Sequence, residues 1–174
     1  QKGCLSLHDI YVEEAEPGDA RRFAKLLAAE MDEFNRRERR GEISAGEAQD
    51  ILNLRSSYRF RAANDHRVGL WESADSTDWT VIYEEDPQFA ASCLNRLVFV
   101  KPLPRLKLLA DNVRLVRRYL STIAVWPWDG RAQEFAGSGV SRICALGESQ
   151  CPTAFWHADG VSSLQQLVDW IDLG

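Results

Sequence analysis

The sequence predicts an α/β protein with a largely parallel open sheet and flanking helices. Two observations lead to this prediction. In the second half of the chain, short apolar runs alternate with segments of helical spacing, an order typical of βαβ crossovers. In addition, the runs Val98–Val100, Ile123–Val125 and Ile143–Leu146 are almost continuously apolar, as expected for strands that are covered on both faces.

The first elements are a short strand and two helices. The strand is expected at Ile10–Val12, and the first helix from Asp19, as its cap, to about Arg37. The apolar residues at helical spacing in this first helix are Phe23, Leu26, Leu27, Met31 and Phe34. Ser44–Glu47 is a capping-box sequence and predicts a second helix, which carries Ala48, Ile51, Leu52 and Tyr58.

A change of period predicts the strands that follow. Residues 67–72 and 79–85 alternate like strands and are separated by a turn segment, which favours a hairpin, and residues 96–103 form a third run. A helix is expected at Leu106–Leu120, a strand at 121–127, a short helix at 130–139 and a strand within 139–146. A last helix is expected from Ser162 to Ile171. No interdomain linker interrupts this order.

Composition excludes several classes of function. The net charge of −5 gives no electrostatic basis for binding nucleic acid, and Arg36–Arg40 is expected to be a solvated helix end. No stretch approaches the roughly 20 apolar residues of a membrane span. The four cysteines are widely spaced, without a CxxC pair, and no leader precedes them. This favours a reducing, cytoplasmic location.

Cys4 is the first candidate for chemistry. A thiol acts as a nucleophile when it is ionised and accessible, and Gly3 beside it leaves room for a substrate carbonyl. From the residues alone, however, an isolated cysteine before a strand also fits a structural role. Both interpretations stay open at this point.

The other candidates have simpler interpretations. His157 and Asp159 resemble an acid–base pair, but Asp159-Gly160 is also typical of a turn. Cys144, Cys151 and His157 are too widely spaced for a zinc site, so no metal is expected. Glu84–Asp86 is expected to be a solvated loop rather than a general base.

Three segments carry a resemblance to a known family. "QKGCLSLHDIYVE" resembles the catalytic-cysteine segment of the aldehyde dehydrogenase superfamily, and more closely that of bacterial long-chain acyl-CoA reductases of the bioluminescence type. Gln1, Gly3 and Cys4 match, as do Leu5 and Ser6, whereas Leu7 replaces a proline. Residues 79–103 and 139–174 resemble two later segments of the same family, so the similarity runs from Gln1 to Gly174.

The resemblance implies that residues 1–174 form an aldehyde dehydrogenase-like catalytic domain, without the preceding nucleotide-binding domain. Cys4 would attack a fatty acyl-CoA or acyl-protein thioester, and NADPH would reduce the acyl-cysteine to a long-chain aldehyde. Asn95 and Arg96 stand where the superfamily has a glutamate on the nicotinamide ribose, and Cys93 beside them is expected to pack. The isolated chain is expected neither to bind NADPH nor to turn over.

The resemblance also implies partners. An acyl-protein synthetase would donate the acyl group, and a homo-oligomer would form through this domain. Two alternatives remain open: the catalytic part of an NAD(P)-dependent aldehyde dehydrogenase, and a non-enzymatic α/β interaction module in which Cys4 is inert.

Overall fold

The computed structural model describes residues 6–128, 130–153, 155–158, 160–162 and 171. They belong to two compact units, the first ending at Asn112 and the second beginning at Val113. In the described part of the chain, no helix is both long and apolar enough to cross a membrane.

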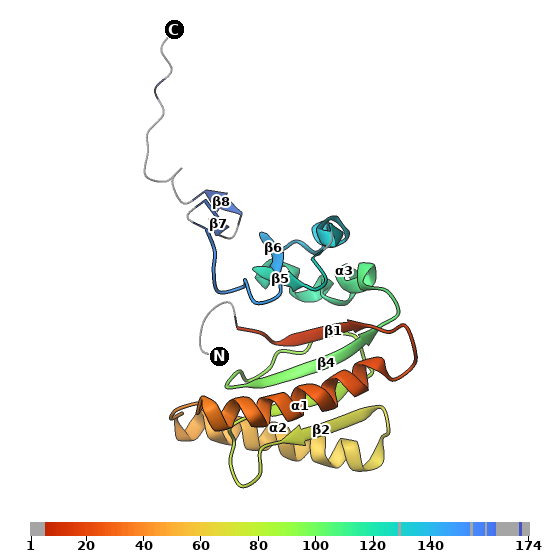
Figure 1. Cartoon of the computed structure of the whole chain (residues 1–174), viewed down its shortest axis with the longest axis vertical. Coiled ribbons are helices and arrows are strands. Elements are labelled where there is room, and N and C mark those ends of the chain that lie inside the picture. Colours follow the sequence, from red (N-terminus) through yellow and green to blue (C-terminus); the bar gives the residue numbers. More distant parts are fainter. Residues whose placement is uncertain (1–5, 129, 154, 159, 163–170, 172–174) are drawn as a thin grey trace. The chain divides into compact units, whose positions relative to one another are not determined.

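The first unit contains a four-stranded mixed sheet (Figure 1). Its strands are β1 (Asp9–Glu13), β2 (Val68–Glu72), β3 (Thr80–Glu84) and β4 (Leu97–Leu103), in the order β1-β4-β3-β2. β1 and β3 run parallel to β4, whereas β2 pairs antiparallel with β3. The predicted α/β class, the mostly parallel sheet and the hairpin are therefore confirmed.

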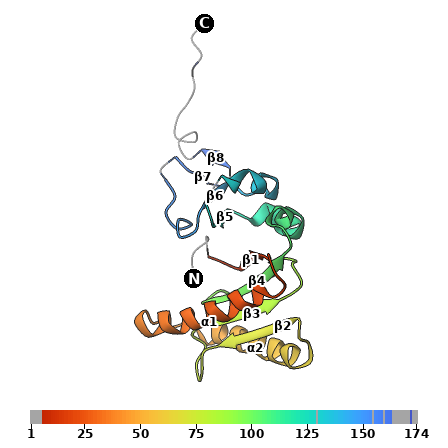
Figure 2. The same ribbon diagram turned by 45° about the vertical axis from the view of Figure 1, so that its right-hand side comes forward.

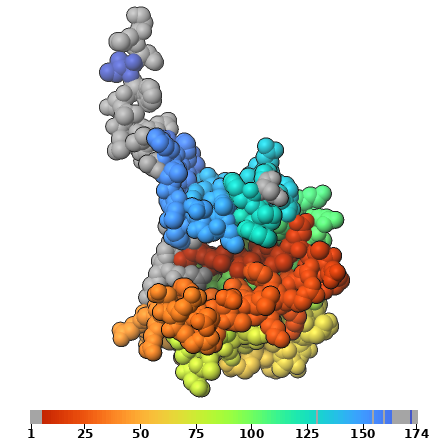
Figure 3. All heavy atoms as spheres, in the orientation of Figure 1, coloured from red at the N-terminus to blue at the C-terminus, as the bar shows by residue number. Residues whose placement is uncertain are grey.

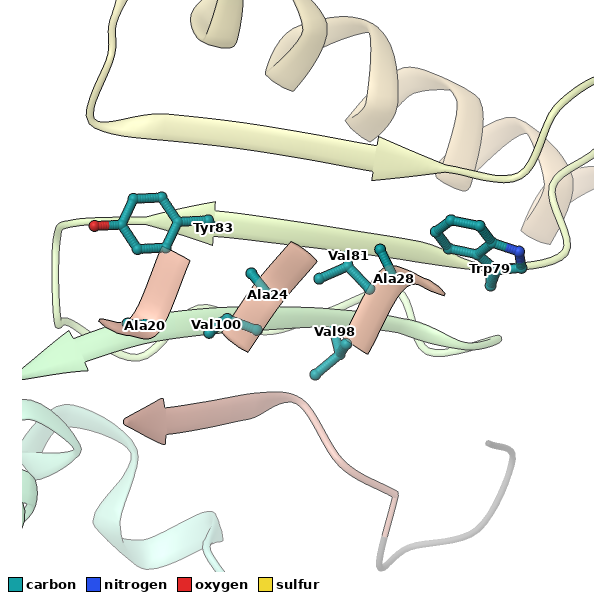
Figure 4. Close-up of a cluster of buried hydrophobic side chains, with 8 residues drawn as sticks. All are labelled: Ala20, Ala24, Ala28, Trp79, Val81, Tyr83, Val98 and Val100. Carbon is teal, nitrogen blue, oxygen red and sulfur yellow. The ribbon is translucent and has the colours of Figure 1, made fainter. Parts of the chain in front are cut away.

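Two helices cover the two faces of this sheet (Figure 2). α1 (Asp19–Arg37) packs on one face, where Ala20, Ala24 and Ala28 meet the side chains of β3 and β4 (Figure 4). α2 (Ala45–Asn64) packs on the other face, where Tyr58 meets Phe99 and its neighbours. Successive residues of β3 and β4 point to opposite faces, and both faces are covered, so both strands are mostly apolar.

The face that α1 buries differs from the expected one. Its buried residues are the three alanines, and of the predicted apolar residues Leu27 and Met31 pack partly buried against the same cluster. Leu26, by contrast, remains 67% exposed, and Phe23 and Phe34 are exposed as well. Small side chains at every fourth position let the helix axis approach the sheet closely, so the larger residues are pushed to its flanks and outer side. The space-filling view shows α1, in orange, on the outside of this unit (Figure 3).

The start of α1 also differs from the prediction. The N-cap is Gly18, with φ of 91°, and Asp19 is the first helical residue. Glu14 acts in place of a capping residue, because its Oε1 accepts hydrogen bonds from the backbone N–H groups of Gly18 and Ala20, both at 3.2 Å. At α2, by contrast, the predicted capping box of Ser44 and Glu47 is confirmed.

The helix expected at Leu106–Leu120 is interrupted. The structure has η1 (Leu106–Leu108) and α3 (Leu109–Asn112) in the first unit and η2 (Arg114–Tyr119) in the second. The Asn112 side chain donates to the Leu108 carbonyl at 2.9 Å. An asparagine that bonds to the local backbone in this way competes with helix continuation, which explains the break.

The second unit contains the predicted strand–helix–strand order. β5 (Thr122–Val125) and β6 (Arg142–Ala145) pair in parallel, and η3 (Arg131–Ser138), a 3₁₀ helix, connects them. The short strands β7 (His157–Ala158) and β8 (Val161–Ser162) pair antiparallel. Ser162 thus lies in a strand, and residues 163–170 of the expected last helix lie outside the described residues.

Candidate functional site

The predicted nucleophile, Cys4, lies outside the residues that the structure describes, so its role stays a prediction. The described residues that follow it lead into β1, which begins at Asp9. Because β1, β3 and β4 run in the same direction, their N-terminal ends lie at one end of the sheet. The segments just before β1, β3 and β4 therefore make up the described part of the candidate site.

His8 joins two of these segments. Its Nδ1 accepts a hydrogen bond from the backbone N–H of Ser92 at 3.1 Å, and the Ser92 hydroxyl lies 3.0 Å from the same nitrogen. The His8 carbonyl accepts from the backbone N–H of Phe99 at 3.0 Å. His8 is thus fixed by its side chain to the loop before β4 and by its backbone to β4 itself.

These contacts define the protonation state of His8. Burial lowers the pKa of the imidazole, which favours the neutral ring. Because Nδ1 accepts from the Ser92 N–H, the neutral ring carries its proton on Nε2. His8 therefore acts as an acceptor toward the loop.

The loop before β4 contains a run of left-handed backbone. Leu94, Asn95 and Arg96 have φ angles of 61°, 54° and 63°. Non-glycine residues pay about 1–2 kcal/mol each in this conformation, and such strain is often found at functional sites. Backbone hydrogen bonds keep the run in place: Leu97 N–H to the Leu94 carbonyl at 3.0 Å and Thr80 N–H to the Arg96 carbonyl at 2.9 Å.

The side chain of Asn95 points into the protein. It is 4% exposed, and its Nδ2 donates to Oε1 of Glu47, at the start of α2, at 3.3 Å. Its Oδ1 is buried and has no partner among the described residues. Most buried polar atoms have a hydrogen-bond partner, so this acceptor is an exception in the described part of the chain.

Arg96 has partners in the protein. Its Nη1 donates to Oδ1 of Asn35 at 2.9 Å and to the Glu38 carbonyl at 2.7 Å, and its guanidinium lies 4.9 Å from the centre of the Phe34 ring. These contacts tie the strained loop to the end of α1. A cofactor contact by Asn95 and Arg96 stays a prediction.

A buried ionic cluster lies on the α2 face of the sheet. Lys101 of β4 is 1% exposed, and its Nζ lies 3.3 Å from Oε2 of Glu84 and 2.8 Å from the Asp86 carbonyl. Glu84 also accepts from the Tyr58 hydroxyl, at 3.1 Å, and from Arg61. Glu84 was expected in a solvated loop and is instead 8% exposed, because the strand extends through it and three donors pair with its carboxylate.

Asp9, at the start of β1, belongs to the same cluster. Burial raises the pKa of its carboxyl to about 7, against the opposing effect of the Lys101 charge. Its Oδ1 accepts from the Ala90 N–H at 3.4 Å, whereas its Oδ2 and the Tyr11 hydroxyl are buried without a partner among the described residues. Burial and the nearby Asp9 also raise the pKa of Tyr11.

Two arginines fix the segment before β3. Arg55 of α2 is buried and donates to the Ser76 carbonyl at 2.6 Å and to the Trp79 carbonyl at 2.7 Å. Arg40 donates to the Thr77 carbonyl at 2.7 Å. Arg40 was expected in a solvated helix end, but its side chain is only 9% exposed because it crosses to this segment, whereas Arg36 and Arg37 are solvated.

The contacts of the remaining described candidates fit structural roles. Gly160, with φ of 80°, donates its N–H to the His157 carbonyl at 3.0 Å, so the turn is confirmed, and Asp159 lies outside the described residues. Cys93 packs against the apolar cluster on the α2 face, and burial raises the pKa of its thiol. Over the described ranges, three or more potential metal ligands nowhere come together.

Comparison with protein families decides the affiliation. The family model described as "Acyl-CoA reductase (LuxC)" matches residues 1–170, nearly the whole chain. The chain belongs to the acyl-CoA reductase (LuxC) family. The resemblance predicted from the sequence is therefore confirmed. A search of curated proteins found no significant match. In this LuxC-family chain, the described residues that follow Cys4 in the sequence enter the sheet at the N-terminal end of β1.

Proposed function

We propose that this chain carries the acyl-accepting cysteine of a reductase that converts a fatty acyl thioester to a long-chain aldehyde. The acyl donor is an acyl-CoA or an acyl-protein, the reductant is NADPH, and Cys4 is the nucleophile. The observation that supports this proposal is the match of the LuxC family over residues 1–170, which includes the "GCLS" segment.

The first step is acyl transfer. The Cys4 thiolate adds to the thioester carbonyl, and the tetrahedral intermediate collapses by breaking the bond to the donor sulfur. Coenzyme A, or the donor protein, leaves as a thiolate, and the acyl group stays on Cys4 as a new thioester. A thioester suits this exchange because its carbonyl is more electrophilic than that of an ester and thiolate is a competent leaving group.

The second step is a two-electron reduction. NADPH, when bound, supplies the hydride for the carbonyl carbon of the acyl-cysteine. The resulting thiohemiacetal on Cys4 breaks its carbon–sulfur bond, which releases the aldehyde and returns the thiolate. Summed over both steps, one acyl thioester, one NADPH and one proton give one aldehyde, one free thiol and NADP⁺.

The described residues have supporting roles. His8 holds the start of β1 against the loop of Ser92, which fixes the described residues that follow the nucleophile in the chain. In the same loop, Asn95 Oδ1 offers an acceptor for a ribose hydroxyl of the cofactor. An acyl-protein synthetase as donor and a homo-oligomer are part of the same proposal.

Acylation of the full-length protein tests this function. We expect palmitoyl-CoA to add one acyl group, located on Cys4 by peptide mass spectrometry and removed by neutral hydroxylamine. Cys4→Ala should abolish the adduct, whereas Cys151→Ala, which removes an exposed cysteine, should leave it unchanged. An adduct that persists in Cys4→Ala, or full reductase turnover in Cys4→Ser, would overturn the proposal.

A further inference from the structure

A concave surface in the second unit is rich in arginine. It has a volume of about 600 Å³ and is lined by η2 residues and one glycine: Arg114, Leu115, Arg117, Arg118, Tyr119 and Gly139. We call it the arginine pocket. Three arginines of one short helix thus line one hollow, and none of the residues that line it is acidic.

The three arginines lack counterions in the described part of the chain. Elsewhere, exposed arginines pair with carboxylates, as Arg36 does with Asp32 and Arg59 with Glu72. Within the described residues, no ion pair or side-chain hydrogen bond involves Arg114, Arg117 or Arg118. Three positive charges that line one hollow without a counterion favour the binding of an anion there.

Gly139 shapes the pocket. A Cβ atom on this residue would lie 2.4 Å from both Cγ and Nε of Arg117, and the glycine has φ of 85°. The Arg117 side chain therefore lies directly against a stretch of backbone that only glycine leaves open. Gly130, at the other end of η3, has φ of 86° but no atom within 4 Å of the corresponding Cβ position. Of the two glycines that flank η3, Gly139 alone has such a close approach.

Aromatic and apolar side chains stand beside the guanidinium groups. Tyr119 and Leu115 line the same hollow and are each 79% exposed. Planar guanidinium groups bind phosphates in pairs of hydrogen bonds, and both arginine and tyrosine stack on the face of a nucleobase. A ligand that combines phosphates with a flat base matches this set of groups. A hollow of this size is in the range of small-molecule sites rather than flat protein interfaces.

We propose that the arginine pocket binds the phosphorylated adenosine of a coenzyme. This inference rests on the proposed function, whose two coenzymes, CoA and NADPH, both carry an adenosine with a ribose phosphate and a pyrophosphate. The guanidinium groups of Arg114, Arg117 and Arg118 hold the phosphates, and Tyr119 contacts the base. CoA and NADPH differ in the position of the ribose phosphate, which is 3′ in CoA and 2′ in NADPH.

Titration of the full-length protein with two probes tests the inference. Adenosine 3′,5′-bisphosphate represents the CoA end and adenosine 2′,5′-bisphosphate the NADPH end, and both are measured by calorimetry, with adenosine as the uncharged control. We expect one bisphosphate to bind at least tenfold more tightly than adenosine, with an affinity that falls as salt rises. Preference for the 3′ probe assigns the pocket to CoA, and preference for the 2′ probe assigns it to NADPH.

Matched variants separate the pocket from other sites. Arg117→Gln and Arg118→Gln should each weaken bisphosphate binding about tenfold, whereas Arg22→Gln on the surface of α1 should not. Gly139→Ala should weaken binding because it displaces Arg117, while Gly130→Ala introduces similar backbone strain without that contact and should bind normally. Unchanged binding in Arg117→Gln and Arg118→Gln, or no binding of either bisphosphate, would overturn the inference.

The two proposals fail in distinguishable ways. Cys4→Ala should bind the bisphosphates as the wild type does, because the pocket contains no part of the acylation chemistry. If Cys4 is acylated but neither bisphosphate binds, the pocket assignment is wrong and the proposed function stands. If a bisphosphate binds in the pocket but Cys4 is never acylated, the proposed function is wrong.

Discussion

His8 accepts a hydrogen bond on Nδ1 from the backbone N–H of Ser92, at 3.1 Å. The contact joins the segment that follows Cys4 with the loop that precedes β4, although the two residues are 84 positions apart in the chain. The run of left-handed backbone begins at Leu94, two residues after Ser92. We therefore expect His8 to act as a positioning residue for the proposed nucleophile.

Replacement of His8 tests this role. His8→Ala should lower the free energy of unfolding by about 1 kcal/mol, since it leaves the Ser92 N–H without its acceptor. It should also slow acylation of Cys4 roughly tenfold, because the residues that follow Cys4 lose their attachment to the loop of Ser92. Acylation is followed by mass spectrometry under conditions in which both proteins are fully folded, and stability by urea denaturation.

His8→Asn is the matched control. The asparagine Oδ1 can take the place of Nδ1 as an acceptor, so acylation should recover most of its rate. A purely structural role would instead give a loss of stability with an unchanged acylation rate in His8→Ala, and that result would contradict the positioning role.

Asp9 gives a pH dependence of stability. Its pKa is raised from 3.8 to about 7 in the folded protein, so between these values the folded state binds a proton that the unfolded state has released. Stability therefore falls as pH rises from 3.8 to about 7, by up to about 1.4 kcal/mol for each pH unit. Asp9→Asn should be more stable than the wild type at pH 8, and this advantage should shrink toward pH 5. Urea denaturation at both pH values measures it.

Asp65 provides a control of opposite sign. Arg67 lowers the pKa of this exposed carboxyl to about 2, below its ordinary value of 3.8. Its favourable contribution is complete above both values, so any difference between Asp65→Asn and the wild type should be the same at pH 5 and pH 8. An Asp9→Asn advantage that is equally independent of pH would show that Asp9 does not titrate between these values.

Elements fixed by local contacts could be predicted from the sequence. The capping box of Ser44 and Glu47 spans four residues, and the hairpin of β2 and β3 follows from alternation on both sides of one turn. The bounds of α1 were also predicted well. Its buried face was predicted only in part: Leu27 and Met31 pack against the core, but hydrophobicity also favours phenylalanine and leucine over the alanines that approach the sheet closely.

Features that depend on contacts between residues far apart in the chain left little trace in the sequence. The partners of Glu84 come from α2 and β4, so nothing near it in the sequence indicates burial. The one indication of the ionic cluster in the sequence of β4 is Lys101, a charged residue in an otherwise apolar strand. The left-handed run at Leu94–Arg96 contains no glycine to mark it. One of the hydrogen bonds that hold it comes from Thr80 of the neighbouring strand β3, a contact that no local pattern encodes.

The buried pair of Lys101 and Glu84 should be strongly coupled. Lys101→Met should cost about 3 kcal/mol of stability, because it removes a cation from a buried carboxylate, and Glu84→Gln should cost a similar amount. The double variant should cost clearly less than the sum, since neither charge is then left without the other. Urea denaturation of the three variants measures the coupling.

An exposed ion pair is the control for this cycle. Arg36→Gln removes the pair with Glu33 at the surface of α1, where solvent screens the charges, and should change stability little. Additive costs for Lys101→Met and Glu84→Gln would mean that the two charges do not stabilise one another.

The left-handed run makes an unusual prediction for Leu94. Leu94→Ala and Leu94→Gly both remove the side chain, so they differ only in the Cβ atom. At φ of 61° the Cβ is unfavourable, and glycine should be more stable than alanine by about 1 kcal/mol. At Lys25, on the exposed side of α1, the order should be reversed, with Lys25→Ala more stable than Lys25→Gly by about 1 kcal/mol. Urea denaturation of the four variants compares the two positions. If alanine is also the more stable residue at position 94, the loop is not held in the left-handed conformation in solution.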